Sequence, residues 1–484
     1  MSERAQIQRA SRLHARFAIP RDGFDKVVRR SHRNWIILLY GLILAGICTY
    51  VVANVRGLVI LWDETEAEAF LRFLFYPSAA WAAAGILLLS YRTVLWIRYR
   101  PFPPADFEEA PSLSVIVPAF NEGAMVLKSL ESVLAARYPE ERLELVVVDD
   151  GSTDDTWEYI DRVAQDHPGR VTAVRFPKNR GKREALACGF AQARGELLVT
   201  LDSDSVIEPD ALLALAGPFR DPTVGAVAGK VIVYNREEGI IPRMLHVRFL
   251  LTFDVSRAVE SSYGTVYCCP GALTAYRAAA LTHILPRWKN QRFLGARCVT
   301  GEDRALTNDL LDKGFNTVYQ SAAVVMTVVP VRYQKLCRMF LRWDRSYVRE
   351  ELRFLRIVWK RPWYARWIAF LDRLVTNLHF PIGYGALVLV AADTIANPPF
   401  ALQFLGAMGF FLLLSTLYCL RSERTLRGLF YGVLFGYFSA FAMSWIMPYA
   451  FFTVRSRSWL TRTAKPKSVS LRRAAATPCT NPVV

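Results

Sequence analysis

Hydrophobic and polar positions follow two different patterns along the chain, which change near residues 104 and 361. Two apolar runs precede this central region, Trp35–Ala53 and Phe73–Tyr91. Three more follow it: Leu374–Ala392, Phe400–Leu420 and Gly428–Phe452. Each approaches or exceeds the roughly 20 residues that a helix needs to cross a bilayer. The pattern predicts transmembrane helices on both sides of the central region.

The central region, residues 104–361, has short β-branched runs alternating with amphipathic stretches, for example Leu113–Pro118, Leu145–Val148 and Leu197–Leu201. Continuous apolar runs bounded by turn residues are typical of buried parallel strands. We therefore expect an α/β domain with an open, mostly parallel sheet. Ligands of such sheets bind at the carboxyl ends of the strands.

Two segments of this region resemble helices that lie on a membrane surface. In Gln334–Glu350, apolar residues recur at helical spacing and basic residues supply charge: Leu336, Met339, Phe340, Trp343 and Tyr347, with Lys335, Arg338, Arg342, Arg345 and Arg349. Such amphipathic, basic helices bind at the bilayer interface. Pro242–Glu260 shows the same pattern more weakly.

The charge distribution orients these elements. The net charge is +17, and residues 1–34 carry nine Lys/Arg against three acids, directly before the first apolar run. The positive-inside rule then places the N-terminus and the central domain in the cytosol of a plasma-membrane protein. Five crossings would export the basic tail, so we expect Gly432, Gly436 and Pro448 to break the last run into a re-entrant hairpin or two short crossings.

These patterns divide the chain into four parts: 1–103, a basic segment and a two-helix transmembrane hairpin; 104–361, the cytosolic domain; 362–463, C-terminal transmembrane helices; and 464–484, a tail expected to be disordered. The eight cysteines are scattered without metal-ligand spacing, so no zinc site is expected. The basic residues follow membrane borders, and no nucleic-acid module is recognised. The first apolar run lacks a cleavage motif and is read as a retained helix.

Three strand ends carry polar residues that suit a nucleotide. One predicted strand and its end lie in Val115–Glu122. A second lies in Leu145–Asp154 and ends with two adjacent acids, and a third lies in Leu197–Ser205 and ends with an Asp-x-Asp pair. Carboxylates two residues apart at a strand end can hold Mg²⁺ against a diphosphate. Asn179–Arg183 offers cations for that diphosphate. Each segment alone also fits a capped turn or a solvated loop, but together they predict a nucleoside-diphosphate site.

These segments, with Gly301–Thr307 and Arg342–Trp343, resemble the inverting family-2 glycosyltransferases, nearest to hyaluronan synthases and nodulation-type chitooligosaccharide synthases, over roughly residues 110–350. The resemblance implies a GT-A-like cytosolic α/β domain inserted between transmembrane helices. It also implies a UDP-sugar donor, a growing glycan as acceptor, and Mg²⁺ or Mn²⁺ as cofactor.

The resemblance assigns roles to individual residues. Asp303 is the catalytic base, and Asp204 is the metal ligand beside Asp202. The expected donor-binding residues are Pro118, Phe120, Asn121, Glu122, Asp149, Asp150, Lys182, Arg183, Asp202, Asp204 and Arg342. The expected acceptor-binding residues are Glu302, Trp343, Cys269 and Gly271, and the expected gating-loop residues over the nucleotide are Trp459, Thr461 and Arg462. For Trp343 and Trp459, a tryptophan at the lipid headgroups is the alternative reading.

The chain departs from the family pattern at two places. Met339 stands where processive members have Gln in Gln-x-x-Arg-Trp, and Pro270–Gly271 stands where the nearest relatives usually show Gly-Pro. Both departures lie in segments expected to contact the acceptor. They bear on sugar choice and processivity rather than on the fold.

The sequence thus predicts a membrane-embedded synthase that polymerises UDP-sugars into a β-linked, hyaluronan- or chitin-like polysaccharide and translocates it outward. Its partners are the donor, the glycan and the bilayer, with no nucleic acid, and a monomer is the working hypothesis. One alternative is a non-processive transferase that moves one sugar onto a lipid. Another is a non-enzymatic polysaccharide transporter.

Overall fold

The computed structural model describes residues 85–396, 398–417 and 426–456. The chain divides into two compact units. The described part of the first unit comprises residues 99–370 and 435–456, and that of the second comprises residues 85–98 and most of 371–434. The described part of the first unit is therefore built from two separate stretches of chain.

An eight-stranded sheet with the order β3-β2-β1-β4-β7-β6-β10-β5 forms the centre of the first unit. Its strands are β1 Leu113–Ala119, β2 Leu143–Asp149, β3 Val171–Arg175, β4 Leu197–Leu201, β5 Ser205–Ile207, β6 Val224–Val233, β7 Leu273–Arg277 and β10 Asn316–Thr327. β3, β2, β1 and β4 are parallel, as are β6 and β10, whereas β7 and β5 run antiparallel to their neighbours. The predicted mostly parallel sheet is confirmed.

The strands form where the chain has uninterrupted apolar runs. Every residue of β1 is buried, as is every residue of β4. A strand covered by helices on both faces needs side chains that avoid water on both faces, which explains why alternation is absent. The three strands predicted from apolar runs are β1, β2 and β4.

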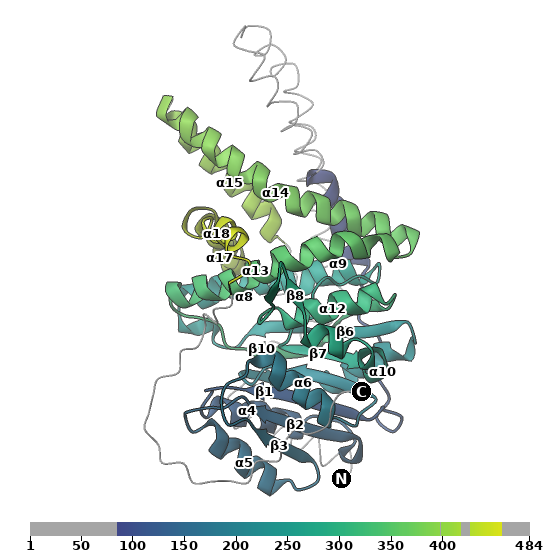
Figure 1. Ribbon diagram of the computed structural model, residues 1–484. Helices are drawn as coiled ribbons and strands as arrows, with labels where there is room; N and C mark the ends of the chain where they lie inside the picture. Colours follow the sequence, from purple (N-terminus) through teal and green to yellow (C-terminus); the bar gives the residue numbers. More distant parts are fainter. Residues whose placement is uncertain (1–84, 397, 418–425, 457–484) are drawn as a thin grey trace. The chain divides into compact units, whose positions relative to one another are not determined.

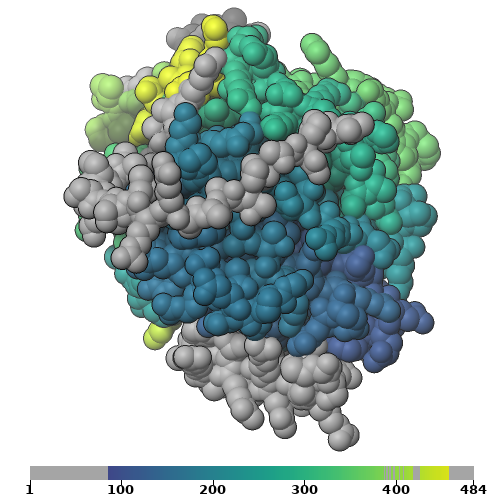
Figure 2. All heavy atoms as spheres, turned by 60° about the horizontal axis from the view of Figure 1, so that its bottom comes forward, coloured from purple at the N-terminus to yellow at the C-terminus, as the bar shows by residue number. Residues whose placement is uncertain are grey.

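Helices α4 Met125–Leu134, α5 Thr156–Asp166 and α6 Lys182–Gln192 connect the parallel strands and pack on the sheet (Figure 1). This unit also contains the helices α7 Ala211–Ala216, α8 Ile240–Phe249, α9 Arg257–Ser261, α10 Ala278–Thr282, α11 Leu285–Lys289, α12 Glu302–Asp312, α13 Tyr333–Ile357 and α18 Ile446–Phe452, together with the start of α14 Trp363–Ala396 and the second half of α17 Leu426–Ala442. A small hairpin, β8 Arg292–Phe293 and β9 Ala296–Arg297, lies outside the main sheet. Figure 2 shows the first half of this α/β unit, in blue, on the side turned forward.

The long helix α13 contains the predicted amphipathic segment Gln334–Glu350 and extends beyond it to Ile357. It packs against α12 and against α18 (Figure 1). Two of its arginines do not lie on a polar outer face: Arg345 and Arg349 are 6% and 3% exposed. Arg345 donates to Thr453 Oγ1 at 3.0 Å, so part of the charge read as membrane-facing is used inside the protein.

The second amphipathic segment, Pro242–Glu260, forms a helix whose middle turns, Leu250–Ser256, have π-helical hydrogen bonding between α8 and α9. Such π-turns widen a helix locally. Asp254 in this stretch pairs with Lys230 at 2.7 Å and accepts from Tyr319 Oη at 3.0 Å. The segment is therefore tied to β6 and β10 of the sheet.

The second unit contains a helix over residues 85–98, part of α14 Trp363–Ala396, α15 Pro399–Thr416 and the first half of α17 Leu426–Ala442. Within it Arg92 Nε donates to Asp372 Oδ1 at 2.7 Å. This ion pair gives the buried Asp372, which lies just before the predicted span Leu374–Ala392, a charged partner. The predicted span Trp35–Ala53 and most of Phe73–Tyr91 lie outside the described residues.

In the described part of the chain, no single helix is both long and apolar enough to cross a bilayer, but α17 and α18 together meet that standard, bent by 49° at the break between them. The break falls at residues 443–445 rather than at the positions predicted. Gly432 and Gly436 lie within the continuous α17, and Pro448 lies in the first turn of α18, where proline is tolerated because that N–H has no helical partner. The transmembrane spans remain a prediction.

Candidate active site

The carboxyl ends of β1, β2 and β4 bring the three polar segments together, as the parallel register requires. The loops are joined by side-chain hydrogen bonds. Ser203 Oγ donates to Glu122 Oε1 at 2.8 Å, and the Asn121 backbone N–H donates to Ser152 Oγ at 3.0 Å. Asn121 has φ of 54°, a left-handed conformation that Asn tolerates better than most residues. Pro118 is buried in β1, and Phe120 is half-buried beside it.

The two acids that end β2 hold the neighbouring backbone. Asp150 accepts hydrogen bonds from the N–H groups of Arg180 and Gly181 at 2.7 and 2.8 Å, and burial raises its pKa to about 6. Asp149 is fully buried; its Oδ1 accepts from the Ser152 N–H at 3.0 Å, and its Oδ2 lies 3.3 Å from Arg175 Nε. Burial raises the pKa of Asp149 as well. Asp150 thus holds the loop that leads to α6, and Asp149 holds the turn that follows β2; their contact with a nucleoside remains a prediction.

Gly151 allows this loop to close. Its φ is 75°, and a Cβ there would come within 2.5–2.8 Å of the backbone of Lys178 and Asn179. Because those atoms are backbone, they cannot move aside cheaply. Glycine is therefore required for the second strand end to approach the segment that carries Lys182.

Lys182, at the start of α6, joins two of the predicted subsites. Its Nζ lies 2.5 Å from Asp202 Oδ1 and 3.2 Å from Glu302 Oε1. Burial alone would lower the pKa of Lys182, but the carboxylates of Asp202 and Glu302 outweigh it and raise that pKa above its ordinary value. Burial alone would likewise raise the pKa of Glu302, but Lys182 outweighs it and the pKa of Glu302 is lowered. A charged triad therefore connects the Asp-x-Asp loop to the start of α12.

Gly271 packs directly on this triad. A Cβ at this position would lie 2.8 Å from Lys182 Nζ and 3.4 Å from Asp202 Oδ1. Because this chain has the order Pro270–Gly271, the glycine is the residue that lies against the Lys182–Asp202 ion pair. The sequence assigned Gly271 to the acceptor, and the structure adds that it limits the position of Lys182.

The Asp-x-Asp pair suits a hard divalent ion. Asp204 is half-buried, and its Oδ1 accepts long hydrogen bonds from Ser205 Oγ and Thr327 Oγ1, at 3.4 and 3.3 Å. Among the described residues no cluster of three His, Cys, Asp or Glu side chains could hold a metal by itself. Mg²⁺ and Mn²⁺ sites commonly use one or two carboxylates and complete the shell with phosphate and water. The oxygen donors of Asp202 and Asp204 fit that kind of site.

Asp303 lies in the first turn of α12, next to Glu302. The helix begins after Gly301, whose φ is 74°, and a Cβ on Gly301 would overlap Ser346 Oγ and lie 2.8 Å from Arg349 Nη2 of α13. Burial and the negative charge of Glu302 raise the pKa of Asp303 above its ordinary value. A carboxylate with a raised pKa is a stronger proton acceptor near neutral pH.

The two cysteines before β7 have different surroundings. Cys268 Sγ donates to Asp303 Oδ2 at 3.7 Å, so this residue lies beside the predicted base. Cys269 is fully buried, and its N–H donates to Thr307 Oγ1 at 3.0 Å. Burial raises the pKa of Cys269 to about 12. The sequence selected Cys269 for the acceptor, but its neighbour Cys268 is the one that reaches Asp303.

Arg183 differs from its predicted position. Its side chain is 4% exposed, and Nη1 donates to the Trp288 carbonyl at 2.6 Å and to Gln291 Oε1 at 2.9 Å. The guanidinium also lies over the Trp288 ring, 5.1 Å from its centroid. The structure therefore places Arg183 in the protein interior rather than at the diphosphate. Consecutive residues at a helix start point in different directions, so Lys182 reaches the triad and Arg183 cannot.

On α13, Trp343 lies in an aromatic cluster with Phe249, Phe253 and Phe340, with ring centroids 5.4–6.5 Å apart. Arg342 lies near Glu302 and adds to the positive charge acting on it. Met339 is 7% exposed and packs in the apolar core, so it does not replace the hydrogen bonds of a glutamine. Trp459, Thr461 and Arg462 lie outside the described residues.

Glycosyl transferase family 2 matches residues 114–285. This range contains β1 to β7 and the three acidic strand ends. The matched segment therefore includes most of the predicted donor site.

Three relatives cover longer stretches. The hyaluronan synthase of Streptococcus pyogenes is 34% identical over 312 residues, 62% of this chain and 73% of the relative. An N-acetylglucosaminyltransferase of Azorhizobium caulinodans is 32% identical over 354 residues, 73% and 87% respectively. Another, from Rhizobium meliloti, is 35% identical over 281 residues, 56% and 66%. These matches confirm the resemblance inferred from the motifs.

Among solved structures, a mannosyltransferase from Pyrobaculum calidifontis in complex with GDP-Man and Mn²⁺ matches with a TM-score of 0.45 and 22% identity, over 72% of this chain and 98% of that one. The sequence relatives and the family match show which family this chain belongs to. The chain belongs to glycosyl transferase family 2, and it is a glycosyltransferase.

Proposed function

We propose that this glycosyltransferase is a membrane-embedded synthase that polymerises UDP-sugars into a β-linked, hyaluronan- or chitin-like polysaccharide and passes it outward. The observation that carries the proposal is the Lys182 triad, which joins Asp202 of the Asp-x-Asp loop to Glu302 beside Asp303. The triad brings a donor subsite and a base within reach of one reacting centre. The relatives named hyaluronan synthase and N-acetylglucosaminyltransferase support a polymer of this class.

Asp303 removes the proton from the acceptor hydroxyl in this mechanism. The hydroxyl oxygen attacks the anomeric carbon from the side opposite the departing UDP, which converts an α-linked donor into a β-linked product. The raised pKa of Asp303 matches this role, since its carboxylate gains driving force for accepting a proton. One carboxylate is sufficient because UDP leaves without needing a proton from a second acid, unlike the leaving group of a glycoside hydrolase.

The donor is held by the strand ends. Lys182 supplies a protonated ammonium that can pair with the diphosphate, and Arg342 lies close enough to the acidic cluster to add a second positive charge. Glu122, Asn121 and Asp150 form the hydrogen-bonded rim against which the nucleoside rests. Charge-assisted hydrogen bonds of this kind orient phosphate as well as bind it.

Asp204, with Asp202, would hold Mg²⁺ or Mn²⁺ against the diphosphate. Such an ion neutralises charge that develops on the leaving group. Lys182 shares Asp202 and so contributes positive charge at the same place. The roles of Asp202 and Lys182 are therefore linked: a change in one alters the charge that the other meets.

The acceptor lies beside Asp303, Cys268 and Trp343. Trp343 offers an aromatic face on which a sugar ring can stack, and its ring is held by Phe249 and Phe253. α18, the second helix of the bent pair, packs on α13, and this contact supports an outward path that begins next to α13. Export through this part of the chain accounts for the bilayer as a partner.

The test is UDP release by purified full-length protein in detergent or nanodiscs, with Mg²⁺ or Mn²⁺. UDP-GlcNAc, UDP-GlcA and UDP-Glc are offered singly and in pairs, and product length is measured by gel electrophoresis. Asp303→Asn should lower turnover by at least about 10³-fold, because it removes the general base. Asp312→Asn, on the same helix but in an ion pair with Lys360 at the far end, is the matched control and should stay within about twofold.

Long polymer from one donor set, lost in Asp303→Asn and kept in Asp312→Asn, supports the synthase. A single sugar on lipid would replace it with the non-processive transferase. Activity of Asp303→Asn equal to that of the parent would refute the assignment of the base.

A further inference from the structure

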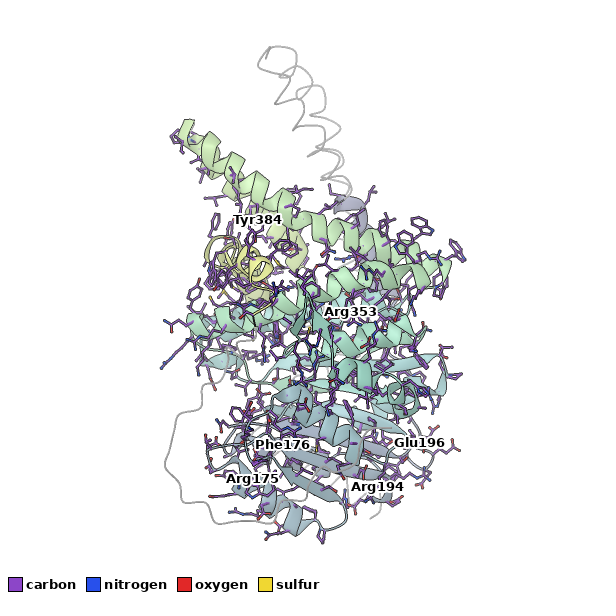
Figure 3. The ribbon with its side chains drawn as sticks, viewed as in Figure 1. Arg175, Phe176, Arg194, Glu196, Arg353 and Tyr384 are labelled. Carbon is purple, nitrogen blue, oxygen red and sulfur yellow. The ribbon has the colours of Figure 1, made fainter. Side chains whose placement is uncertain are left out.

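A buried carboxylate on α13, Glu350, lies at the centre of a hydrogen-bond network outside the sequence motifs. Glu350 is 2% exposed. Its Oε1 accepts from Gln291 Nε2 at 2.7 Å and from Arg349 Nε at 3.2 Å. Its Oε2 accepts from Asn308 Nδ2 at 3.0 Å and from Arg353 Nη1 at 2.7 Å. These four donors match the acceptor capacity of an ionised carboxylate; Figure 3 labels Arg353 on α13.

One branch of the network leads to the loop before the predicted base. Arg349, held by Glu350, also donates through Nη2 to the Thr300 carbonyl. Thr300 and Gly301 directly precede Glu302 and Asp303 in the chain, and the missing Cβ of Gly301 lets α13 approach at this point. The position of the base therefore depends on a contact made by α13.

A second branch leads to Lys182. Gln291 Oε1 accepts from Arg183 Nη1 at 2.9 Å, and Arg183 follows Lys182 at the start of α6. Arg183 also donates to the Trp288 carbonyl, and Trp288 Nε1 donates to the Glu302 carbonyl at 2.8 Å. The same network thus fixes the backbone at both ends of the Lys182–Glu302 ion pair.

The network needs a negative charge at its centre. Arg349 and Arg353 both converge on Glu350, and burial of two guanidinium groups without a carboxylate is costly. Burial alone would raise the pKa of Glu350, but Arg353 and Arg349 outweigh it and the pKa of Glu350 is lowered. The group is therefore a permanent anion at neutral pH.

We propose that Glu350 is a positioning residue for glycosyl transfer, which holds the Thr300 loop and the start of α6 so that Lys182 spans Asp202 and Glu302 while Asp303 faces the acceptor. The inference rests on the roles proposed above for Asp303 and Lys182. The proposal assigns a role to a residue on α13, which packs against the helix that carries Asp303. It also explains why Arg183 is buried, since Arg183 connects the start of α6 to this network through Gln291.

Glu350→Gln in the full-length enzyme tests this directly. The charged and titratable groups around Asp303 are Glu302 and Arg304 on α12, Lys182 on α6, Cys268 and Cys269 before β7, and Tyr276 on β7. Among them Lys182 lowers the pKa of Asp303, so a displaced Lys182 lets that pKa rise. We expect kcat to fall by about tenfold or more and the acid limb of kcat/KM to move to higher pH by about half a unit or more, as the loss of one nearby charge implies.

Asp309→Asn is the matched control. Asp309 is 4% exposed, lies on α12 and pairs with Arg353 at 2.6 Å, so its side chain contacts the network at Arg353 rather than at Thr300 or Gln291. It should lower the melting temperature to a similar extent while leaving the acid limb in place. A structural role alone would make the two variants behave alike.

Gln291→Met is the second variant, in case Glu350→Gln folds poorly. It cuts the branch to Arg183 while Arg349, Arg353 and Asn308 keep their bonds to Glu350. The expected shift of the acid limb has the same direction, with kcat lowered about three- to tenfold for the loss of two side-chain hydrogen bonds, one to Glu350 and one from Arg183.

Acid limbs that stay at the parental pH in both variants, with kcat no lower than in Asp309→Asn, would overturn the proposal. An active Asp303→Asn enzyme would instead remove the base assignment, so the two failures are distinguishable.

Discussion

Replacing Gly271 by alanine adds one methyl group beside the Lys182–Asp202 ion pair. The new Cβ would lie 2.8 Å from Lys182 Nζ, against an ordinary closest contact of 3.4 Å or more, so the ammonium must move by roughly half an ångström or more. Lys182 is a flexible side chain, and Gly271 does not have positive φ, so the free energy of unfolding should change little. We expect the melting temperature to change by less than about 2 °C.

The effect on the reaction should be much larger. A charge-assisted hydrogen bond contributes about 1.5–3 kcal/mol, so loss of the Lys182–Asp202 contact predicts a fall of about 10- to 100-fold in kcat/KM for the donor. Initial rates of UDP release against donor concentration, at saturating Mn²⁺, separate KM from kcat. The donor KM should carry a substantial part of the change.

Gly195→Ala provides the matched control. Its Cβ would meet the backbone of Ser114 and Leu113 at 2.6–2.9 Å, in the loop between α6 and β4. Backbone cannot move aside, so this variant should lose stability without a selective rise in donor KM. If Gly271→Ala kept both the parental donor KM and the parental melting temperature, Lys182 would not be part of the donor site.

Three further predictions concern single side chains. Burial raises the pKa of Asp344 from an unfolded value near 3.8 to about 6. The stability that the protonated Asp344 contributes is therefore fully present below pH 3.8 and is lost as pH rises through about 6. Calorimetry should show that Asp344→Asn raises the melting temperature by a few degrees at pH 8 and leaves it unchanged near pH 4. EDTA should abolish UDP release, and added Mn²⁺ should restore it. The Asp204→Asn variant should need about tenfold more Mn²⁺ to reach its half-maximal rate. Full activity in EDTA would contradict the metal assignment. Met339→Gln should lower the melting temperature, since it buries an amide in an apolar core at a cost of about 1–3 kcal/mol, without raising the rate; a faster enzyme would show that the glutamine position acts on the acceptor even here.

The strands of the sheet could be predicted because their signal is local. β1, β2 and β4 are buried on both faces, and burial of that kind requires an unbroken apolar run within a few residues. The positions of β7 and β5, which run against the other strands, depend on long-range pairing that leaves no local mark. The break between α17 and α18 lies outside the residues predicted for it, for a related reason. Gly432 and Gly436 lower helix propensity, but they interrupt a helix only where packing does not stabilise it.

The acidic strand ends could be found from spacing, because parallel neighbours carry their carboxyl ends to one edge. Directions of individual side chains could not. Arg183 follows Lys182 in a basic run that suits a diphosphate, yet it turns inward to Trp288 and Gln291. Glu350 gives no signal in the sequence either, since its donors come from α12, from α13 and from Gln291 after α11. Burial and partner geometry, rather than residue type, separate these groups.

The described part of the first unit comprises residues 99–370 and 435–456, and Arg345 of α13 in the first stretch donates to Thr453, directly after α18, in the second. A ribosome reaches residue 453 only after it has made every residue of the intervening stretch. At about 5–20 residues per second, α13 waits roughly 4–17 s for this packing partner. An enzyme built in this order acquires the complete packing around α13 late in synthesis, so we expect glycosyltransferase activity only after the intervening segment has been translated.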